Sequence, residues 1–164
     1  MSDKLALLAP ICSITIPAIP PFIAADHYKL GTQDGVVIGF VGIRLIQLVS
    51  GLVEAEAPEA TLHLQMLQRP AKDPEIIAEF GEDKAGITFG QMWEVLKAQG
   101  EGGEGNLLAN GYTNIFYCHS QQGSLLLPVY CFWFSVSHYW RVDASPTPNP
   151  DDWYASEQVV FRTA

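Results

Sequence analysis

The stretch LLLPVYCFWFSV, residues Leu125–Val136, decides the fold class of this chain. It is rich in aromatic and β-branched side chains, which favour strands. Because side chains alternate between the two faces of a strand, large apolar groups fall on both faces. One face carries Cys131, Trp133 and Ser135, and the other carries Tyr130, Phe132 and Phe134. The strand therefore needs cover on both sides.

Segments on either side of this strand have the same composition. They are Tyr112–His119, His138–Asp143 and Gln158–Arg162. Ser120–Gly123 has the residues of a hairpin turn between the first two strands. Prolines keep Ser145–Pro150 out of a sheet interior, because proline donates no backbone hydrogen bond. These patterns predict an antiparallel meander that begins at about residue 112.

Aromatic residues are concentrated on and around this meander. A monomer rarely leaves a large apolar patch bare, so the second face of the strand must meet a layer of the same domain, another subunit or a ligand. Aromatic side chains are common at interface anchors and in pocket walls. The residues that we expect at such a ligand site or interface are Tyr117, Tyr130, Trp133, Tyr139, Trp140, Trp153 and Tyr154.

Two helices are predicted in the middle of the chain. Asp73 is expected to cap a short helix, with Pro74 at its first position and Gly81 at its end. Thr88 and Gln91 have the spacing of a capping box, in which each side chain bonds to the backbone of the other residue. They predict a second helix that ends near Gly100.

The segment Val36–Val53 is almost entirely apolar. A membrane span is not expected, because Arg44 near its centre would cost roughly 2.5–3.5 kcal/mol on insertion. The β-branched residues predict a strand over Val36–Val41. Polar residues at helical spacing compete with that preference further on, so residues 42–56 stay open between helix and strand. The alternation over Thr61–Gln68 predicts a half-buried strand.

Together these elements predict an α+β fold with an antiparallel sheet and two or three helices. Residues 1–24 are expected to form an extended, proline-rich N-terminal arm that belongs to the domain, and residues 25–164 to form a single domain. Prolines interrupt the apolar start of the chain, so it does not resemble a signal peptide. We expect the arm to lie on a neighbouring subunit through Pro17, Ile19, Pro20, Pro21 and Phe22.

The charge balance excludes several classes of partner. The 164 residues carry a net charge of −9, mostly from residues 54–110, so neither nucleic acid nor an anionic membrane is an expected partner. The chain is 48% hydrophobic and only 16% charged, where about 25% is usual, which excludes general disorder. Its three cysteines cannot all pair with one another, so we expect reduced thiols and a cytoplasmic location.

No metal or cofactor is expected from the motifs. Cys118 and His119 are adjacent on a strand, so their side chains point to opposite faces. Cys131 and His138 lack the short spacing of zinc ligands. The run GEGGEG at residues 100–105 matches a dinucleotide fingerprint in letters only, because it follows a helix and leads to a strand. We therefore interpret it as a loop.

Two alternatives involve small molecules. An apolar, aromatic-lined cavity would suit a small apolar ligand or acid/base catalysis, since such a cavity moves the pKa of a carboxyl or imidazole towards neutrality. Tyr117 shares one strand face with His119, and Trp140 shares another with His138. The weak catalytic candidates are Asp26, His27, His119 and His138. A carbohydrate-binding module is the second alternative, with Trp153 and Tyr154 as a stacking platform beside Asp151 and Asp152.

The leading expectation is a non-catalytic module that forms a homo-oligomer, a dimer or larger, or binds a partner protein. The apolar arm and the strand with two apolar faces carry this expectation. The sequence does not indicate the biological process or the identity of a ligand.

Overall fold

The computed structural model describes residues 6–81, 86–99, 105–120, 125–146 and 149–162. Its strands are β1 (Leu8–Ile16), β2 (Phe22–Ile23), β3 (Gly31–Gln33), β4 (Val36–Val41), β5 (Val53–Glu54), β6 (Ala60–Leu67), β7 (Asn114–His119), β8 (Leu126–Phe134), β9 (Tyr139–Ala144) and β10 (Gln158–Arg162). Its described helices are α1 (Ile43–Val49), α2 (Asp73–Phe80) and α4 (Phe89–Gln99), and a 3₁₀ turn, η1, covers Ala24–Asp26.

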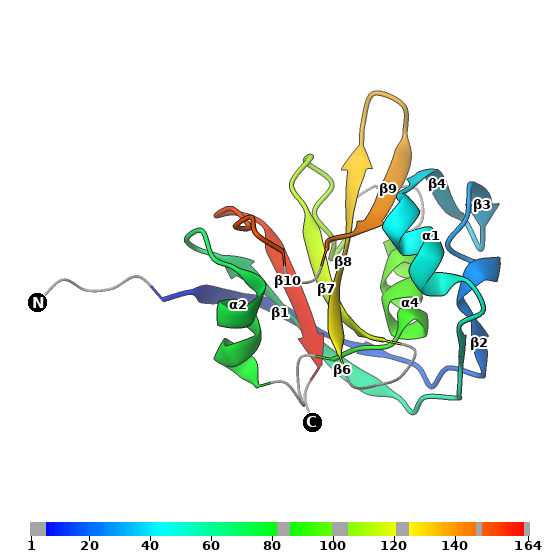
Figure 1. Ribbon diagram of the computed structural model, residues 1–164, viewed down its shortest axis with the longest axis horizontal. Helices are drawn as coiled ribbons and strands as arrows, with labels where there is room; N and C mark the ends of the chain where they lie inside the picture. Colours follow the sequence, from blue (N-terminus) through cyan, green and yellow to red (C-terminus); the bar gives the residue numbers. More distant parts are fainter. Residues whose placement is uncertain (1–5, 82–85, 100–104, 121–124, 147–148, 163–164) are drawn as a thin grey trace, which may run out of the picture.

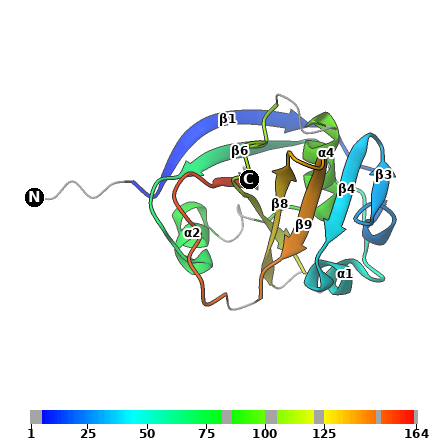
Figure 2. The ribbon, with the colours of Figure 1, turned by 90° about the horizontal axis from the view of Figure 1, so that it is seen from above.

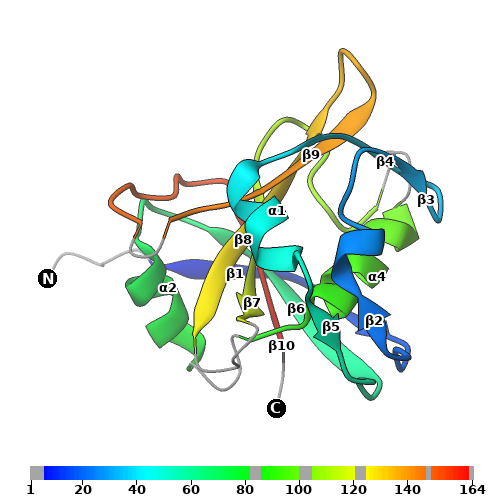
Figure 3. The same cartoon turned by 45° about the vertical axis from the view of Figure 1, so that its right-hand side comes forward.

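Eight strands form one sheet in the order β1-β6-β10-β7-β8-β9-β4-β3 (Figure 1). The strands at the two ends of this sheet run in different directions, as the twist of a large sheet requires (Figure 2). Strands β2 and β5 form a separate two-stranded sheet beside α4 (Figure 3). The α+β single domain is thus confirmed.

The meander β7-β8-β9 is antiparallel throughout and confirms the predicted C-terminal order. The prediction of a wholly antiparallel sheet is wrong, because β10 pairs with β7, and β4 with β9, in parallel. Strand β10 enters between β7 and β6 and so joins the C-terminal meander to the strands near the N-terminus. Such pairings depend on long-range contacts that local sequence patterns do not specify.

Residues 42–56, which the sequence leaves open between helix and strand, contain both: α1 comes first and the short strand β5 follows. The strand expected over Val36–Val41 is β4, and Gly42 is the N-cap of the helix that follows. Leu45 and Val49, one turn apart, are buried, which gives the helix one inward face. Its β-branched residues are tolerated because this burial outweighs their weak helix propensity.

The face of the sheet that packs on α4 forms the larger core. Strand β8 contributes Cys131 and Trp133 to it, and β9 contributes Trp140, in one cluster with the buried side chains of α4. The capping box at the start of α4 is confirmed: the Gln91 amide donates to Thr88 Oγ1 at 3.0 Å, and the Thr88 amide donates to Gln91 Oε1 at 3.0 Å. The expected end at Gly100 lies outside the described residues.

The opposite face of the sheet forms a second core under α2 and Trp153. Tyr130, on this face of β8, meets the Trp153 ring edge-on at a centroid distance of 5.5 Å. Further along the strand, Phe132 and Phe134 are half-buried, and Phe134 stacks on Tyr139 at 5.4 Å. The chain therefore supplies a large part of the cover for its own second aromatic face.

Helix α2 begins differently from the prediction. Lys72, not Asp73, is the N-cap, and it makes no side-chain capping bond. Asp73 lies at the first helical position, where its buried carboxylate accepts hydrogen bonds from Tyr117 and Trp153. The Asp73 side chain thus links the start of α2 to Tyr117 of β7 and to Trp153. The helix begins without a side-chain cap, with Pro74 in its first turn.

The N-terminal arm is built into its own domain. Its first part is β1, which pairs with β6, and its buried side chains Ile16, Ile19 and Phe22 belong to the core on α4. Pro17, Pro20 and Pro21 are exposed. The apolar character of the arm is therefore explained by intramolecular packing and does not require a neighbouring subunit.

Candidate functional site

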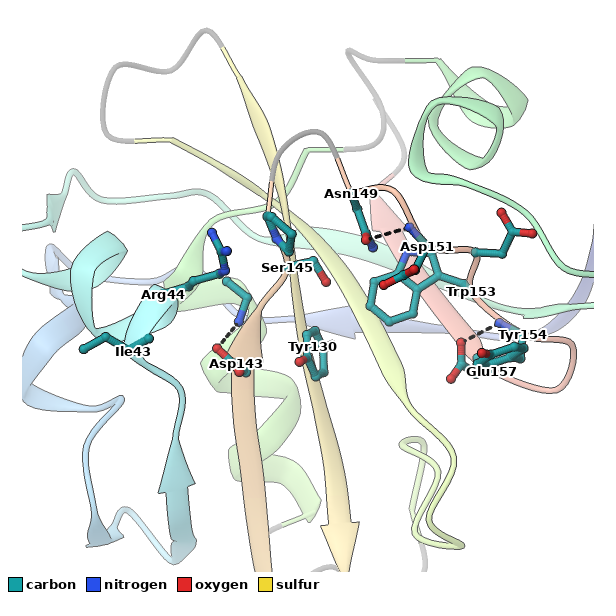
Figure 4. A pocket seen from close by; sticks show the side chains of 13 residues that line it. Ile43, Arg44, Tyr130, Asp143, Ser145, Asn149, Asp151, Trp153, Tyr154 and Glu157 are labelled. Atoms are coloured by element: carbon teal, nitrogen blue, oxygen red, sulfur yellow. Dashed lines mark hydrogen bonds between the residues drawn. The ribbon is translucent and has the colours of Figure 1, made fainter.

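A pocket of about 430 Å³ opens between α1, the middle of β8, the end of β9 and the segment that follows β9 (Figure 4). Side chains reach it from three parts of the chain. It is lined by Ile43, Arg44, Tyr130, Asp143, Ala144, Ser145, Pro146, Asn149, Asp151, Asp152, Trp153, Tyr154 and Glu157. Its volume lies within the range of roughly 300–1,000 Å³ that is usual for small-molecule sites.

Charge in the pocket is unbalanced. Four carboxylates line it together with one guanidinium, that of Arg44. Asp152 is neutralised by Lys72, whose Nζ lies 2.7 Å from its Oδ1. The other three, Asp143, Asp151 and Glu157, exceed the single positive charge of Arg44, so the pocket is acidic.

Two hydrogen bonds and the space beside Gly42 define the position of Asp143 in the pocket. Its Oδ1 accepts a hydrogen bond of 2.7 Å from the Ala144 amide. The hydroxyl of Tyr130 is hydrogen-bonded to its carboxylate, and burial, followed by the charge of Asp143, raises the pKa of this phenol. Gly42 leaves room for the carboxylate, because a Cβ there would lie 1.8 Å from Asp143 Cγ. Asp143 therefore occupies a space that the chain keeps open.

Glu157 is the most enclosed carboxylate of the pocket, with only 7% of the residue exposed. Its Oε2 accepts a hydrogen bond of 2.9 Å from the Tyr154 amide. Burial raises the pKa of this carboxyl, while its bonds with Tyr154 and Thr113 lower it in part. Glu157 is thus a carboxyl that protonates more readily than an exposed glutamate.

The raised pKa of Glu157 predicts that the stability of the fold depends on pH. Because its pKa is raised in the folded protein, folding takes up a proton as the pH falls through that pKa. We expect wild type to gain stability relative to Glu157→Gln between neutral pH and pH values below the raised pKa. Urea unfolding of both proteins across that pH interval measures the difference. A wild type that loses stability relative to the variant on acidification would contradict this assignment.

Aromatic rings form the other walls of the pocket. Trp153 is 9% exposed, and its Nε1 donates to Asp73 Oδ1 at 2.6 Å, which fixes the ring. Tyr154 is 68% exposed. Arg44 and Asp143 reach the pocket from one side in Figure 4, and Trp153, Tyr154 and Glu157 from the other. Because Trp153 is buried, it does not form an exposed stacking platform with Tyr154 as the sequence suggested.

The weak catalytic candidates are not brought together. Asp26 and His27 lie at η1, where the His27 ring stacks on Phe22 at 4.3 Å. His119 lies at the end of β7 against Gly86, and burial, followed by the charge of Arg162, lowers its pKa. His138 is exposed in the turn between β8 and β9. These residues share no common site in the described structure.

Tyr117 and Trp140, the aromatic residues expected beside His119 and His138, do not face one common cavity in the described structure. Tyr117 is buried in the core under α2, and Trp140 is buried in the core under α4, on the other face of the sheet. Trp133 packs edge-on against Trp140 at 5.3 Å. These aromatic residues are part of the packing, whereas Tyr130, Trp153 and Tyr154 do line the pocket.

Several pocket residues had no signal in the sequence. In the sequence, Arg44 is informative only as an obstacle to membrane insertion, and Asp143 and Glu157 belong to no motif. The proline-rich segment after β9 was the usable signal, because loops at strand ends carry a large share of binding residues.

Nowhere in the ranges that the structure describes do three or more His, Cys, Asp or Glu side chains gather so as to hold a metal ion. Among the helices of those ranges, none is long and apolar enough to cross a bilayer. All three cysteines are free: Cys12 is half-buried, and Cys118 and Cys131 are buried.

Comparison of the chain with protein-family models, with curated proteins and with solved structures found no match.

Proposed function

We propose that this protein is a non-catalytic binding domain whose acidic, aromatic-walled pocket takes a small organic cation bearing an ammonium group. The observation that carries the proposal is the convergence of Asp143 and Glu157 with the rings of Tyr130, Trp153 and Tyr154 around one cavity. These carboxylates and rings come from different segments of the chain, and the fold brings them together around the pocket.

Carboxylates and aromatic faces attract the same kind of ligand. A carboxylate attracts an ammonium group by charge and accepts its hydrogen bonds. The face of an aromatic ring attracts a cation through its quadrupole, more strongly when water is displaced. Glu157 and Trp153 are buried, which strengthens both effects by lowering the local dielectric. Arg44, across the pocket, suits a hydroxyl or carbonyl oxygen at the other end of the ligand.

Binding without catalysis fits the chemistry of the pocket lining. The described lining residues include one serine, Ser145, and no histidine or cysteine. Those residues therefore hold neither a Ser–His nor a Cys–His pair, two common forms of an activated nucleophile. The Tyr130 hydroxyl keeps its proton, because its pKa is raised, and acts as a donor to Asp143.

Matched pairs of compounds test the proposal. Glucosamine and glucose differ by one ammonium group in place of a hydroxyl, and putrescine and 1,4-butanediol differ by two. We expect calorimetry to detect binding of the amines and at least tenfold weaker binding of the neutral compounds. Asp143→Asn should weaken amine binding at least tenfold, which corresponds to about 1.4 kcal/mol. Glu59→Gln, an exposed acid outside the pocket lining, is the control and should leave binding unchanged.

The outcomes separate the competing functions. Equal binding of glucose and glucosamine would replace the cation with a carbohydrate ligand. Binding of neither class, or amine binding that Asp143→Asn and Glu59→Gln weaken equally, would overturn the proposal.

Homo-oligomerisation, the first expectation from the sequence, is the second candidate. The proline arm and the aromatic face that suggested it both pack largely within the domain. Its support lies instead at one edge of the large sheet, where a long strand has a neighbour on one side only.

A further inference from the structure

Strand β1 is the first strand of the eight-stranded sheet and pairs with β6 alone (Figure 2). Among the described residues, no other strand or loop shares a backbone hydrogen bond with Leu8–Ile16. Every second residue of such an edge strand points its N–H and C=O groups away from the sheet. The outer side of β1 is therefore a row of donors and acceptors that fits another strand.

The usual protection of an edge strand is incomplete here. Proteins guard open edges with charged side chains, prolines, bulges or short strands. At the other end of the sheet, β3 is only 3 residues long, whereas β1 has 9 residues and none of them is charged. Pro10 and the register shift between Pro10 and Cys12 protect the first part of β1. Residues 12–16 contain no proline, no charged side chain and no register shift.

The side chains along this second part are covered only in part. Cys12 and Ile14 pack against the larger core, yet both are half-buried. A groove of about 240 Å³ lies beside them, between residues 14–17 and α4. Its two charged side chains, Glu94 and Lys97, neutralise each other across 2.8 Å. The groove is thus neutral in a protein with a net charge of −9.

We propose that β1 pairs antiparallel with β1 of a second copy of this chain, so that the two sheets become continuous across a two-fold axis. A second copy fits because it presents the same uncharged strand, and a two-fold axis brings identical strands together antiparallel. Centring the pair on Ile14 keeps Pro10 outside the paired segment. It places Cys12 opposite Ile16 of the second copy. The half-buried Cys12 and Ile14 of each copy are then covered by the other copy.

A lysine at the edge tests the interface. Thr15 and Thr32 are exposed residues on the two opposite edge strands, and replacing either by lysine changes the net charge equally. Analytical ultracentrifugation over a dilution series should find a dimer for wild type and for Thr32→Lys. Thr15→Lys should raise the dissociation constant at least tenfold, because the like charges meet near the axis.

Cross-linking gives an independent readout of the register. Ile14→Cys in a Cys12→Ser background should give a covalent dimer with a short bis-maleimide, because residues opposite one another on paired strands have Cβ atoms about 4.5–5.5 Å apart. Thr32→Cys in the same background should not. A wild type that is monomeric at every concentration overturns the proposal, as does a dimer that Thr15→Lys leaves intact. Asp143→Asn should dimerise like wild type, so failure of the ligand proposal leaves this result unaffected.

Discussion

Replacing Asp73 by alanine should destabilise the fold by about 3–5 kcal/mol, one of the largest effects expected from a single side chain here. Its Oδ1 accepts two hydrogen bonds, from the Tyr117 hydroxyl at 2.8 Å and from Trp153 Nε1 at 2.6 Å. Both donors lie in the core under α2. Alanine would leave them buried and unpaired, and each such group costs about 1–3 kcal/mol. Denaturant unfolding measures the loss.

Asparagine at the same position is the matched control. Because both donors bond to the single atom Oδ1, the amide oxygen of asparagine replaces it for both. We expect Asp73→Asn to retain most of the stability and Lys72→Ala, at the neighbouring exposed residue, to change it little. An asparagine variant as unstable as the alanine variant would show that the charge, and not the acceptor geometry, is what matters.

Local patterns predicted the local elements of this fold. The capping box of Thr88 and Gln91 is formed by residues close in sequence, so the sequence alone predicts it. The Asp34-Gly35 pair is another local signal, for a hairpin turn that the sequence analysis does not include. Their φ angles of 52° and 81° are those of a tight two-residue turn between β3 and β4, which Asp-Gly pairs favour.

The order of the sheet was beyond such patterns. Strand β10 reads as an ordinary apolar strand, and nothing in its residues specifies that it enters between β6 and β7. The aromatic strand β8 shows the same limit: its two apolar faces were correctly predicted, but the identity of the cover was not. Trp153 provides part of that cover from a loop distant in sequence.

The candidate site was predictable only in its aromatic part. Tyr130, Trp153 and Tyr154 were expected to line a ligand site or interface, because large aromatic rings need cover or a partner. The carboxylates were not expected, since their function depends on position in space. Asp143 is a candidate because the fold brings it to the pocket, where Gly42, distant in sequence, leaves room for its carboxylate.

Glu54 differs from Asp73 in how its carboxylate accepts hydrogen bonds: each of its two oxygens accepts one, whereas one oxygen of Asp73 accepts both. Oε2 accepts a hydrogen bond of 2.9 Å from the Phe89 amide, and Oε1 accepts one of 2.9 Å from the Gly90 amide. These are the first amides of α4, which have no partner inside the helix. Burial raises the pKa of this carboxyl, and the two amide bonds lower it in part.

Replacing Glu54 by glutamine should therefore cost about 2–3 kcal/mol, although the two side chains have nearly the same shape. Glutamine offers one oxygen, so its NH₂ group must face the second amide, donor against donor. The attraction between a negative charge and the positive end of the helix is lost as well. Denaturant unfolding measures the change, and Glu56→Gln, at an exposed residue nearby, is the control.

The two conservative amide substitutions then give a joint test of the geometry. Asp73→Asn should be mild because one oxygen serves two donors, and Glu54→Gln should be severe because two oxygens serve one donor each. If stability depended on the negative charge alone, the two variants would lose similar amounts, since each removes one buried or half-buried charge. If it depended on side-chain volume, neither would lose much. Only acceptor geometry predicts a small loss at residue 73 and a large loss at residue 54.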